Sequence, residues 1–291
     1  MKTPMEIRAA NMAARDAWAR RAMQSAQDAS AGAVRGAREL ELERWEAVRA
    51  QLTRLRLPWG MESARVLAAV AAHRAYWRPN DVRLLVLSES QVWTREVELE
   101  ARVPLAVFGH EHAPESFVRL VYCLGYGERD LVQGRVSGNA GTPQFWKLLA
   151  AGIDPALCAQ VVERTQPDLL QRLAAKLAVL EALKARGVWL LDACPVALYA
   201  ASQPKPKMAV LAQAMELAWT AYTREAIAEA APRAVMIVGK MVHDGIGGRI
   251  RAMFGPRVPV QWMYQPQARR PGAEHAAGIE RLRGMVAASG R

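Results

Sequence analysis

The stretch from Val82 to Ser90, VRLLVLSES, decides the fold that the sequence predicts. A run dominated by Val and Leu is followed at once by Ser, Glu and Ser, which is typical of a buried strand that ends at a polar loop. Three more apolar runs follow along the chain, at Val188–Leu191, Ala234–Val238 and Val258–Met263. Strands that alternate with helical stretches indicate crossover units on a parallel sheet, so the sequence predicts an α/β fold.

Helical stretches are expected between and after these strands. They are Glu62–Tyr76, Pro143–Ala151 with Thr142 as its N-cap, Leu169–Lys184, Ala209–Ala230 and Ala273–Val286. Residues 1–56 are rich in Ala, Arg and Glu and carry no strand signal, so we expect a helical extension, broken near Gly32 and Gly36, that ends before Pro58. It either packs beside an α/β domain at residues 57–291 or serves as a partner helix.

Composition limits the classes of function. The chain has 291 residues, 52% of them hydrophobic and 23% charged, which is an ordinary globular balance. No apolar run approaches the roughly 18 residues that a membrane span needs, and charged residues follow Met1 closely, so we expect a cytoplasmic protein with no membrane partner. The cysteines Cys123, Cys158 and Cys194 are far apart, which excludes a four-cysteine metal site and favours reduced, structural thiols.

The charge balance favours a polyanionic partner. The formal net charge is +11, and from Arg233 to the end ten Lys or Arg stand against three Asp or Glu. Lys and Arg neutralise phosphates and release counterions, which favours nucleic acid. A solvated basic surface without such a partner is the alternative that composition leaves open.

Polar residues follow each expected strand. The segments are Ser88-Glu89-Ser90, Asp192-Ala193-Cys194, Gly239-Lys240 and Tyr264-Gln265-Pro266-Gln267. Ligands of parallel sheets bind beyond the carboxyl ends of the strands, so chemistry is expected there. Polar residues also follow strands simply because the chain has reached solvent, and spacing alone does not separate the two interpretations.

Taken in order, these segments resemble the uracil-DNA glycosylase superfamily from roughly Tyr76 to Arg283. Tyr76-Trp77-Arg78-Pro79 with residues 82–90 resembles its aromatic-proline lead-in, first strand and water-activating loop. Residues 138–149 resemble its Gly-rich turn and the helix that follows, and residues 187–192 resemble the strand that ends in a base-reading Asn. The segment from Trp219 to Gly239 resembles its long helix and the strand that ends in Gly. Residues 260–267 lie where the family has its His-Pro-Ser loop.

The resemblance implies a three-layer α/β/α fold around a four-stranded, mainly parallel sheet. It also implies a monomeric base-excision repair enzyme without metal or cofactor, which hydrolyses the N-glycosidic bond of uracil or another deaminated base flipped out of single- or double-stranded DNA. By the match of segments, Glu89, Ser90 and Gln265 would be catalytic, Ser88, Tyr126 and Asp192 would bind the base, and Lys240, Arg269 and Arg270 would contact DNA.

Three positions depart from the family pattern. Ser90 stands where a carboxylate usually orients the attacking water, with Glu89 one residue earlier. Gln265 stands in the slot of a His that stabilises the departing base anion, and Asp192 replaces the base-reading Asn. Each position has a structural alternative: a solvated loop for Glu89, a helix cap or turn for Asp192, and a turn before Pro266 for Gln265.

Two other classes of function therefore stay open. The first is a nucleic-acid-binding module that has kept the fold and lost the chemistry, and the second is an enzyme acting on a small anionic metabolite. For Tyr126, which lies between Gly125 and Gly127, a loop role is the alternative to base stacking. The run His110-Glu111-His112 lacks metal-binding spacing, because adjacent helix positions point in different directions.

Overall fold

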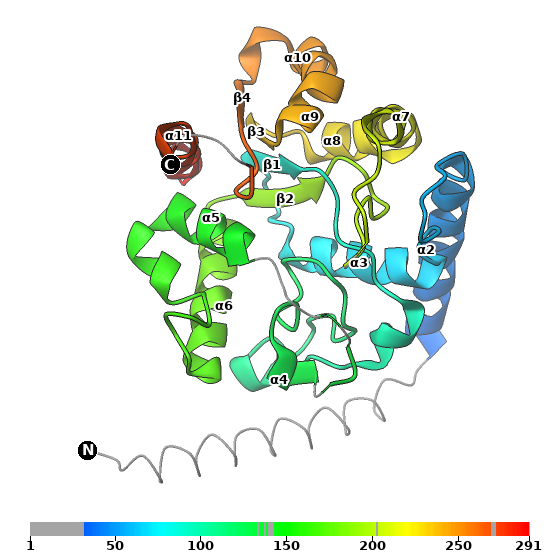
Figure 1. Ribbon diagram of the computed structural model, residues 1–291, viewed down its shortest axis with the longest axis vertical. Helices are drawn as coiled ribbons and strands as arrows, with labels where there is room; N and C mark the ends of the chain where they lie inside the picture. The colour runs from blue at the N-terminus through cyan, green and yellow to red at the C-terminus, as the bar shows by residue number, and fades with distance from the viewer. Residues whose placement is uncertain are drawn as a thin grey trace.

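The computed structural model describes residues 32–132, 134–136, 138, 143–201, 203–268 and 272–290. Its centre is a four-stranded sheet in the order β2-β1-β3-β4, surrounded by helices (Figure 1). The strands are β1 (Leu84–Ser88), β2 (Val188–Asp192), β3 (Ala234–Val238) and β4 (Val260–Met263). All three neighbouring pairs are parallel, which confirms the predicted α/β class.

The strands β1, β2 and β3 consist mainly of apolar residues, whereas the edge strand β4 has one buried residue, Met263, and an exposed Gln261. All residues of β1 and β2 are buried, as parallel strands with helices over them require. In the register, Ser88 lies opposite Asp192 and Val238 lies opposite Met263. The carboxyl ends of the strands therefore reach the same edge of the sheet, and the loops that follow them can meet there.

The helices fall close to their expected positions. The longer ones are α2 (Gly32–Gln51), α3 (Ala64–Trp77), α5 (Pro143–Ile153), α6 (Leu169–Ala185), α7 (Met208–Ala218), α8 (Arg224–Ala230), α10 (Gly248–Phe254) and α11 (Gly272–Ser289), and the shorter ones are α4 (Arg129–Val132) and α9 (Lys240–Val242). Two π-helical segments, η4 (Trp219–Thr223) and η5 (His243–Gly247), join α7 to α8 and α9 to α10. The side chains of Ser63 and Asp168 cap α3 and α6 by accepting backbone N–H bonds.

Short 3₁₀ turns complete the connections. They are η1 (Glu96–Glu100), η2 (Ala106–Phe108), η3 (Pro155–Ala159) and η6 (Gly255–Arg257). The expected N-cap Thr142 lies outside the described residues. Among the described helices, none combines the length and the apolar character that crossing a membrane would require.

The helix α2 corrects one expectation. It continues through Gly36 without a break, because the Ala, Arg and Glu residues around that glycine are strong helix formers and one interior glycine costs only about 1 kcal/mol. Trp45, Val48 and Leu52 are buried, and the Trp45 ring lies 5.2 Å from that of Tyr222. The part of the extension that the structure describes thus packs beside the α/β domain.

Candidate functional site

The loops that follow β1 and β2 are joined to each other by backbone contacts. Ala193 and Cys194 donate N–H bonds to the carbonyls of Ser88 and Glu89, at 2.8 and 2.9 Å. Further on, Val92 forms a parallel bridge with Tyr199. These backbone contacts between the two loops fix the direction in which the side chains of Glu89 and Tyr199 project at the carboxyl edge of the sheet.

Glu89 is the centre of a cluster made by three separate loops. The hydroxyl of Tyr199 donates a hydrogen bond to Oε1 of Glu89, and the side-chain amide of Gln265 donates to Oε2 at 2.5 Å. Glu89 follows β1, Tyr199 lies beyond β2 and Gln265 follows β4. We call these three residues the Glu89 cluster. Two of its members, Glu89 and Gln265, were expected to lie in one site from the sequence.

Gly239 makes the contact between Glu89 and Gln265 possible. The strand β3 lies between β1 and β4, and its last residue is followed by Gly239 at a φ of 124°. A Cβ at this position would lie 3.2 Å from Cγ and 3.3 Å from Nε2 of Gln265. Only a residue without a side chain adopts this backbone conformation readily and also lets the Gln265 side chain pass over it.

The electrostatics of Glu89 are those of a buried carboxyl group with neutral partners. Burial raises the pKa of Glu89 above its usual range, while the hydrogen bonds from Tyr199 and Gln265 and the nearby charge of Lys205 oppose that rise. The residue Glu89 is only 5% exposed, and no cation bonds its carboxyl group directly among the described residues. A perturbed acid of this kind, at the edge where ligands of such sheets bind, is a candidate for catalysis.

Asp192 lies at the neighbouring strand end in a different setting. Its Oδ1 accepts a hydrogen bond from the Ser88 hydroxyl, and its Oδ2 accepts one from Nη2 of Arg74, with which it forms an ion pair that is 3% exposed on each side. Gln91 also accepts from the same nitrogen at 2.9 Å. The structure thus brings Ser88 and Asp192 together at the strand ends, as part of a buried network with Arg74, and their base-binding role stays a prediction.

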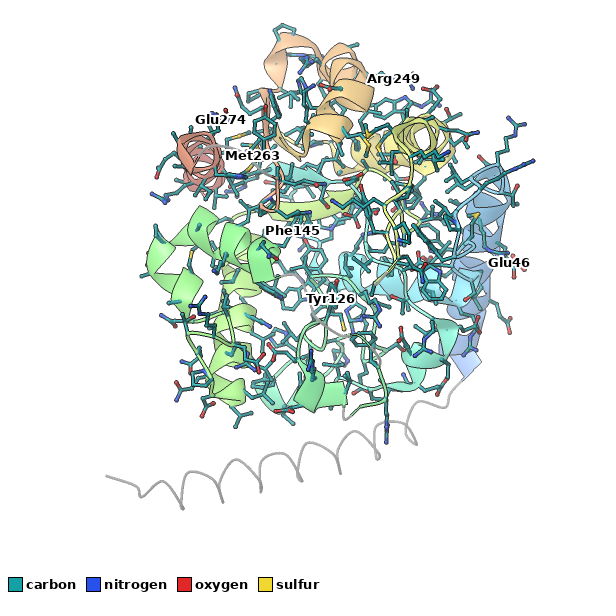
Figure 2. All side chains as sticks on the ribbon, in the orientation of Figure 1. Glu46, Tyr126, Phe145, Arg249, Met263 and Glu274 are labelled. Carbon is teal, nitrogen blue, oxygen red and sulfur yellow. The ribbon has the colours of Figure 1, made fainter. Side chains whose placement is uncertain are left out.

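Ser90 and Tyr126 also have structural surroundings. The hydroxyl of Ser90 donates to the carbonyl of Gln91 at 2.9 Å and accepts from the backbone of Leu198 at 3.1 Å, so it holds the two loops together. Tyr126 is 5% exposed, and burial raises its pKa to about 12. No hydrogen bond or ring contact among the described residues joins Tyr126 to the Glu89 cluster, and Figure 2 shows it well separated from Met263, the last residue of β4.

The expected DNA contacts are described only in part. Lys240 is exposed directly after Gly239, and its ammonium group pairs with Asp244 on the surface. Arg269 and Arg270 lie outside the described residues. Other exposed cations of this region are Lys205, Lys207, Arg249 and Arg251.

A cavity of about 450 Å³ lies at the opposite, amino-terminal end of the sheet. Its walls include Arg83 and Gly187, which directly precede β1 and β2. Beside them the Tyr76 hydroxyl and Nδ1 of His110 share a hydrogen bond of 2.7 Å, and Nε2 of His110 lies 3.1 Å from Glu181. None of the described residues expected to be functional lines this cavity, and we place the candidate site at the carboxyl edge because the Glu89 cluster lies there.

Two of the residues that shape the strand ends could not be found from the sequence. Arg74 stands in the apolar stretch of α3, and a charged residue at such a position is a weak signal that a buried partner exists. Tyr199 follows the apolar residues Val196, Ala197 and Leu198 and carries no comparable signal. Both reach their partners across more than a hundred residues of chain, with separations of 118 for Arg74–Asp192 and 110 for Tyr199–Glu89.

Comparison with known proteins identifies no family: no family model matches the chain, and no curated protein matches it significantly. Within the part of the chain that the structure describes, no group of three or more His, Cys, Asp or Glu is arranged to hold a metal ion. The chemistry of the site is therefore argued from the side chains of the Glu89 cluster alone.

Proposed function

We propose that the protein is a uracil-DNA glycosylase-like enzyme of three-layer α/β/α architecture, which hydrolyses the N-glycosidic bond of uracil or another deaminated base flipped out of DNA. The observation that carries the proposal is the meeting of Glu89 and Gln265 across Gly239. These two residues are 176 positions apart in the chain and share one hydrogen bond. Both come from loops in which the family resemblance implies catalytic residues. The parallel four-stranded sheet and the excess of basic residues in the last fifth of the chain support the same conclusion.

The reaction needs a negative group near the sugar and a hydrogen-bond donor near the base. In the proposed reaction, the flipped base displaces the Gln265 amide from Glu89 and accepts its hydrogen bond at a carbonyl oxygen. The bond between C1′ and the base nitrogen breaks, and its electron pair leaves with the base. The Glu89 carboxylate stabilises the positive charge that develops on the sugar and takes one proton from the water that adds to C1′. Glu89 then releases this proton to solvent and the departing base takes one up, so one water is consumed in all.

The other residues of the strand ends have supporting roles in this proposal. Tyr199 orients Glu89 and favours its ionised form, because its hydroxyl donates to the carboxylate and lowers the pKa that burial raises. Ser90 fixes the loop on which Glu89 stands. Asp192, Ser88 and Arg74 stabilise the strand ends beneath the site.

Base release from defined oligonucleotides tests the proposal. Labelled strands carrying uracil, hypoxanthine or xanthine are incubated with the protein, single-stranded and paired, and abasic sites are then cleaved with alkali. We expect scission at one or more of these bases and a loss of roughly 100-fold or more for Glu89→Gln, the scale of a positioned acid or base. Glu216→Gln, which changes an exposed carboxylate on α7, is the matched control and keeps full activity. Absence of scission on every lesion with enzyme in excess would refute the catalytic proposal.

A nucleic-acid-binding module without chemistry is the second candidate, and one observation favours it. Both oxygens of Glu89 accept a hydrogen bond, and the residue is 5% exposed, so the cluster is saturated as it stands. In that case oligonucleotide binding shows a steep dependence on salt, and Glu89→Gln leaves the affinity unchanged while no base is released.

A further inference from the structure

Three aromatic rings lie against one another beside β4, and the chain passes from the last of them directly to Gln265 of the Glu89 cluster. The rings of His243 and Trp262 are stacked, with centroids 4.8 Å apart and planes 22° apart. Trp262 in turn meets Tyr264 edge to face at 4.9 Å. The next residue after Tyr264 is Gln265, which bonds Glu89. We call His243, Trp262 and Tyr264 the aromatic row.

The local structure holds this row at the surface. Trp262 and Tyr264 are two residues apart on the edge strand β4 and its continuation, so their side chains share one face. His243 begins the π-helical segment η5, and Gly247 of that segment lets the imidazole lie close, because a Cβ there would be 3.2 Å from Cδ2 of His243. All three side chains remain partly exposed.

Positive charge accompanies the aromatic row. Nη1 of Arg251 lies 3.5 Å from Nε2 of His243, and this exposed arginine forms no ion pair with a described carboxylate. Lys240 is exposed on the neighbouring helix α9. From Lys240 to Arg257 the chain has four Lys or Arg and one Asp, so the surface complements a polyanion. Figure 2 shows Arg249, a residue of α10 that pairs with Glu216, on the outer side of the molecule.

We infer that the aromatic row and Arg251 form a binding track for single-stranded DNA, which leads the strand to Glu89. Aromatic side chains stack on bases of any sequence, and arginines beside them neutralise the phosphates. This combination suits a strand whose bases are already unstacked better than a closed duplex, where ring faces are covered. The inference rests on the proposed function and adds the form of the substrate.

Binding measurements on a variant without turnover test the inference separately from catalysis. The full-length Glu89→Gln protein is titrated into a fluorescent thymine oligonucleotide of about 12 nucleotides, a length within the range that single-strand sites cover, and into the matching duplex. We expect the single strand to bind more tightly. Adding Trp262→Leu weakens single-strand binding by about tenfold or more, since one stacked base contributes roughly 1–3 kcal/mol. Trp262→Phe keeps a ring and retains most of the affinity, which separates stacking from a folding defect.

Charge is tested in the same way. Arg251→Gln reduces the slope of log affinity against log salt by about one, as expected for one phosphate contact. Arg233→Gln, which removes an exposed arginine at the amino end of the sheet, has a much smaller effect. The inference of a binding track is refuted if single strand and duplex bind equally well. It is also refuted if Trp262→Leu leaves the affinity for the single strand unchanged.

The two proposals fail in different ways. If no base is released but Trp262→Leu abolishes single-strand binding, the catalytic proposal is wrong and the track stands. If bases are released and Trp262→Leu leaves KM unchanged, the track is wrong and the catalytic proposal stands.

Discussion

Glu89 and Asp192 stand at the ends of neighbouring strands, yet their surroundings are opposite. Asp192 is bonded by the guanidinium of Arg74 and by the Ser88 hydroxyl. Glu89 is bonded by two neutral donors, Tyr199 and Gln265, and its pKa is raised. Asp192 is thus paired with a cation inside the protein, whereas Glu89 is buried with neutral partners. Under the proposed function Asp192 stabilises the strand ends and Glu89 takes part in the chemistry, and the predictions below are designed to break or sharpen this comparison.

The largest effect is expected from Arg74→Met. This change leaves Asp192 buried without its cation, and breaking a buried ion pair by removing one partner costs about 3–5 kcal/mol. The free energy of unfolding, measured by urea denaturation, should fall by that amount. The control is Arg65→Gln, which removes an exposed arginine paired with Glu96 and should cost less than about 1 kcal/mol. A loss as small as that of the control would show that Asp192 does not need Arg74.

The second effect is expected from Gly239→Ala. A residue with a side chain is strained at a φ of 124°, and the new methyl group would press against Gln265. We expect a loss of about 1–3 kcal/mol in unfolding free energy together with reduced base release, because Gln265 moves away from Glu89. Gly60→Ala is the matched control: its φ of 75° is also unfavourable, but a Cβ there meets nothing within 4 Å. The control loses stability and keeps activity.

The third prediction concerns the pH dependence of activity. The Tyr199 hydroxyl bonds the ionised form of Glu89 and thereby lowers its pKa, so Tyr199→Phe raises that pKa further. Because the reaction needs the carboxylate, the acidic limb of the pH–rate profile should move to higher pH when this hydrogen bond to a charged group is lost. Tyr76→Phe, at the opposite end of the sheet, leaves the limb in place. A downward shift in Tyr199→Phe would contradict the assignment of Glu89 as the base.

How far the sequence predicts the molecule depends on the range of the interactions. The strand β3 was predicted at its observed bounds, since a continuous apolar run between polar residues is a local signal. The predicted fourth strand began too early, at Val258, because Pro259 has no N–H to extend the ladder of β4. The meeting of Glu89 with Gln265 followed from topology alone, as parallel strands end at one edge.

The hydrogen-bond partners of Glu89 and Asp192 could not be predicted from local sequence patterns. Arg74 reaches Asp192 from α3, and Tyr199 reaches Glu89 from an irregular loop. Neither pair is marked by a periodic pattern of residues in the sequence. The base-reading role expected for Asp192 came from the family resemblance, which places a base-reading residue at the end of β2, and a helix cap or turn was the alternative. These long-range contacts decide which carboxyl group is paired with a cation and which has neutral partners.

The smallest change in stability is expected from Glu89→Gln, and it gives the sharpest comparison with Asp192→Asn. The folded state binds the Glu89 proton more tightly than the unfolded state, whose pKa is near 4.5, so the stability that this proton contributes is present below that pH and is lost as the pH rises through the folded pKa. A neutral amide removes this loss. The unfolding free energy of Glu89→Gln should therefore lie within about 1 kcal/mol of that of the original protein at acidic pH and should exceed it increasingly toward neutral pH.

Asp192→Asn should lose several kcal/mol of unfolding free energy near neutral pH, because it leaves the Arg74 guanidinium buried without its counter-ion. Urea denaturation of both variants at pH 4 and pH 8 measures the difference, and equal, large losses at both pH values would make Glu89 a structural carboxylate like its neighbour.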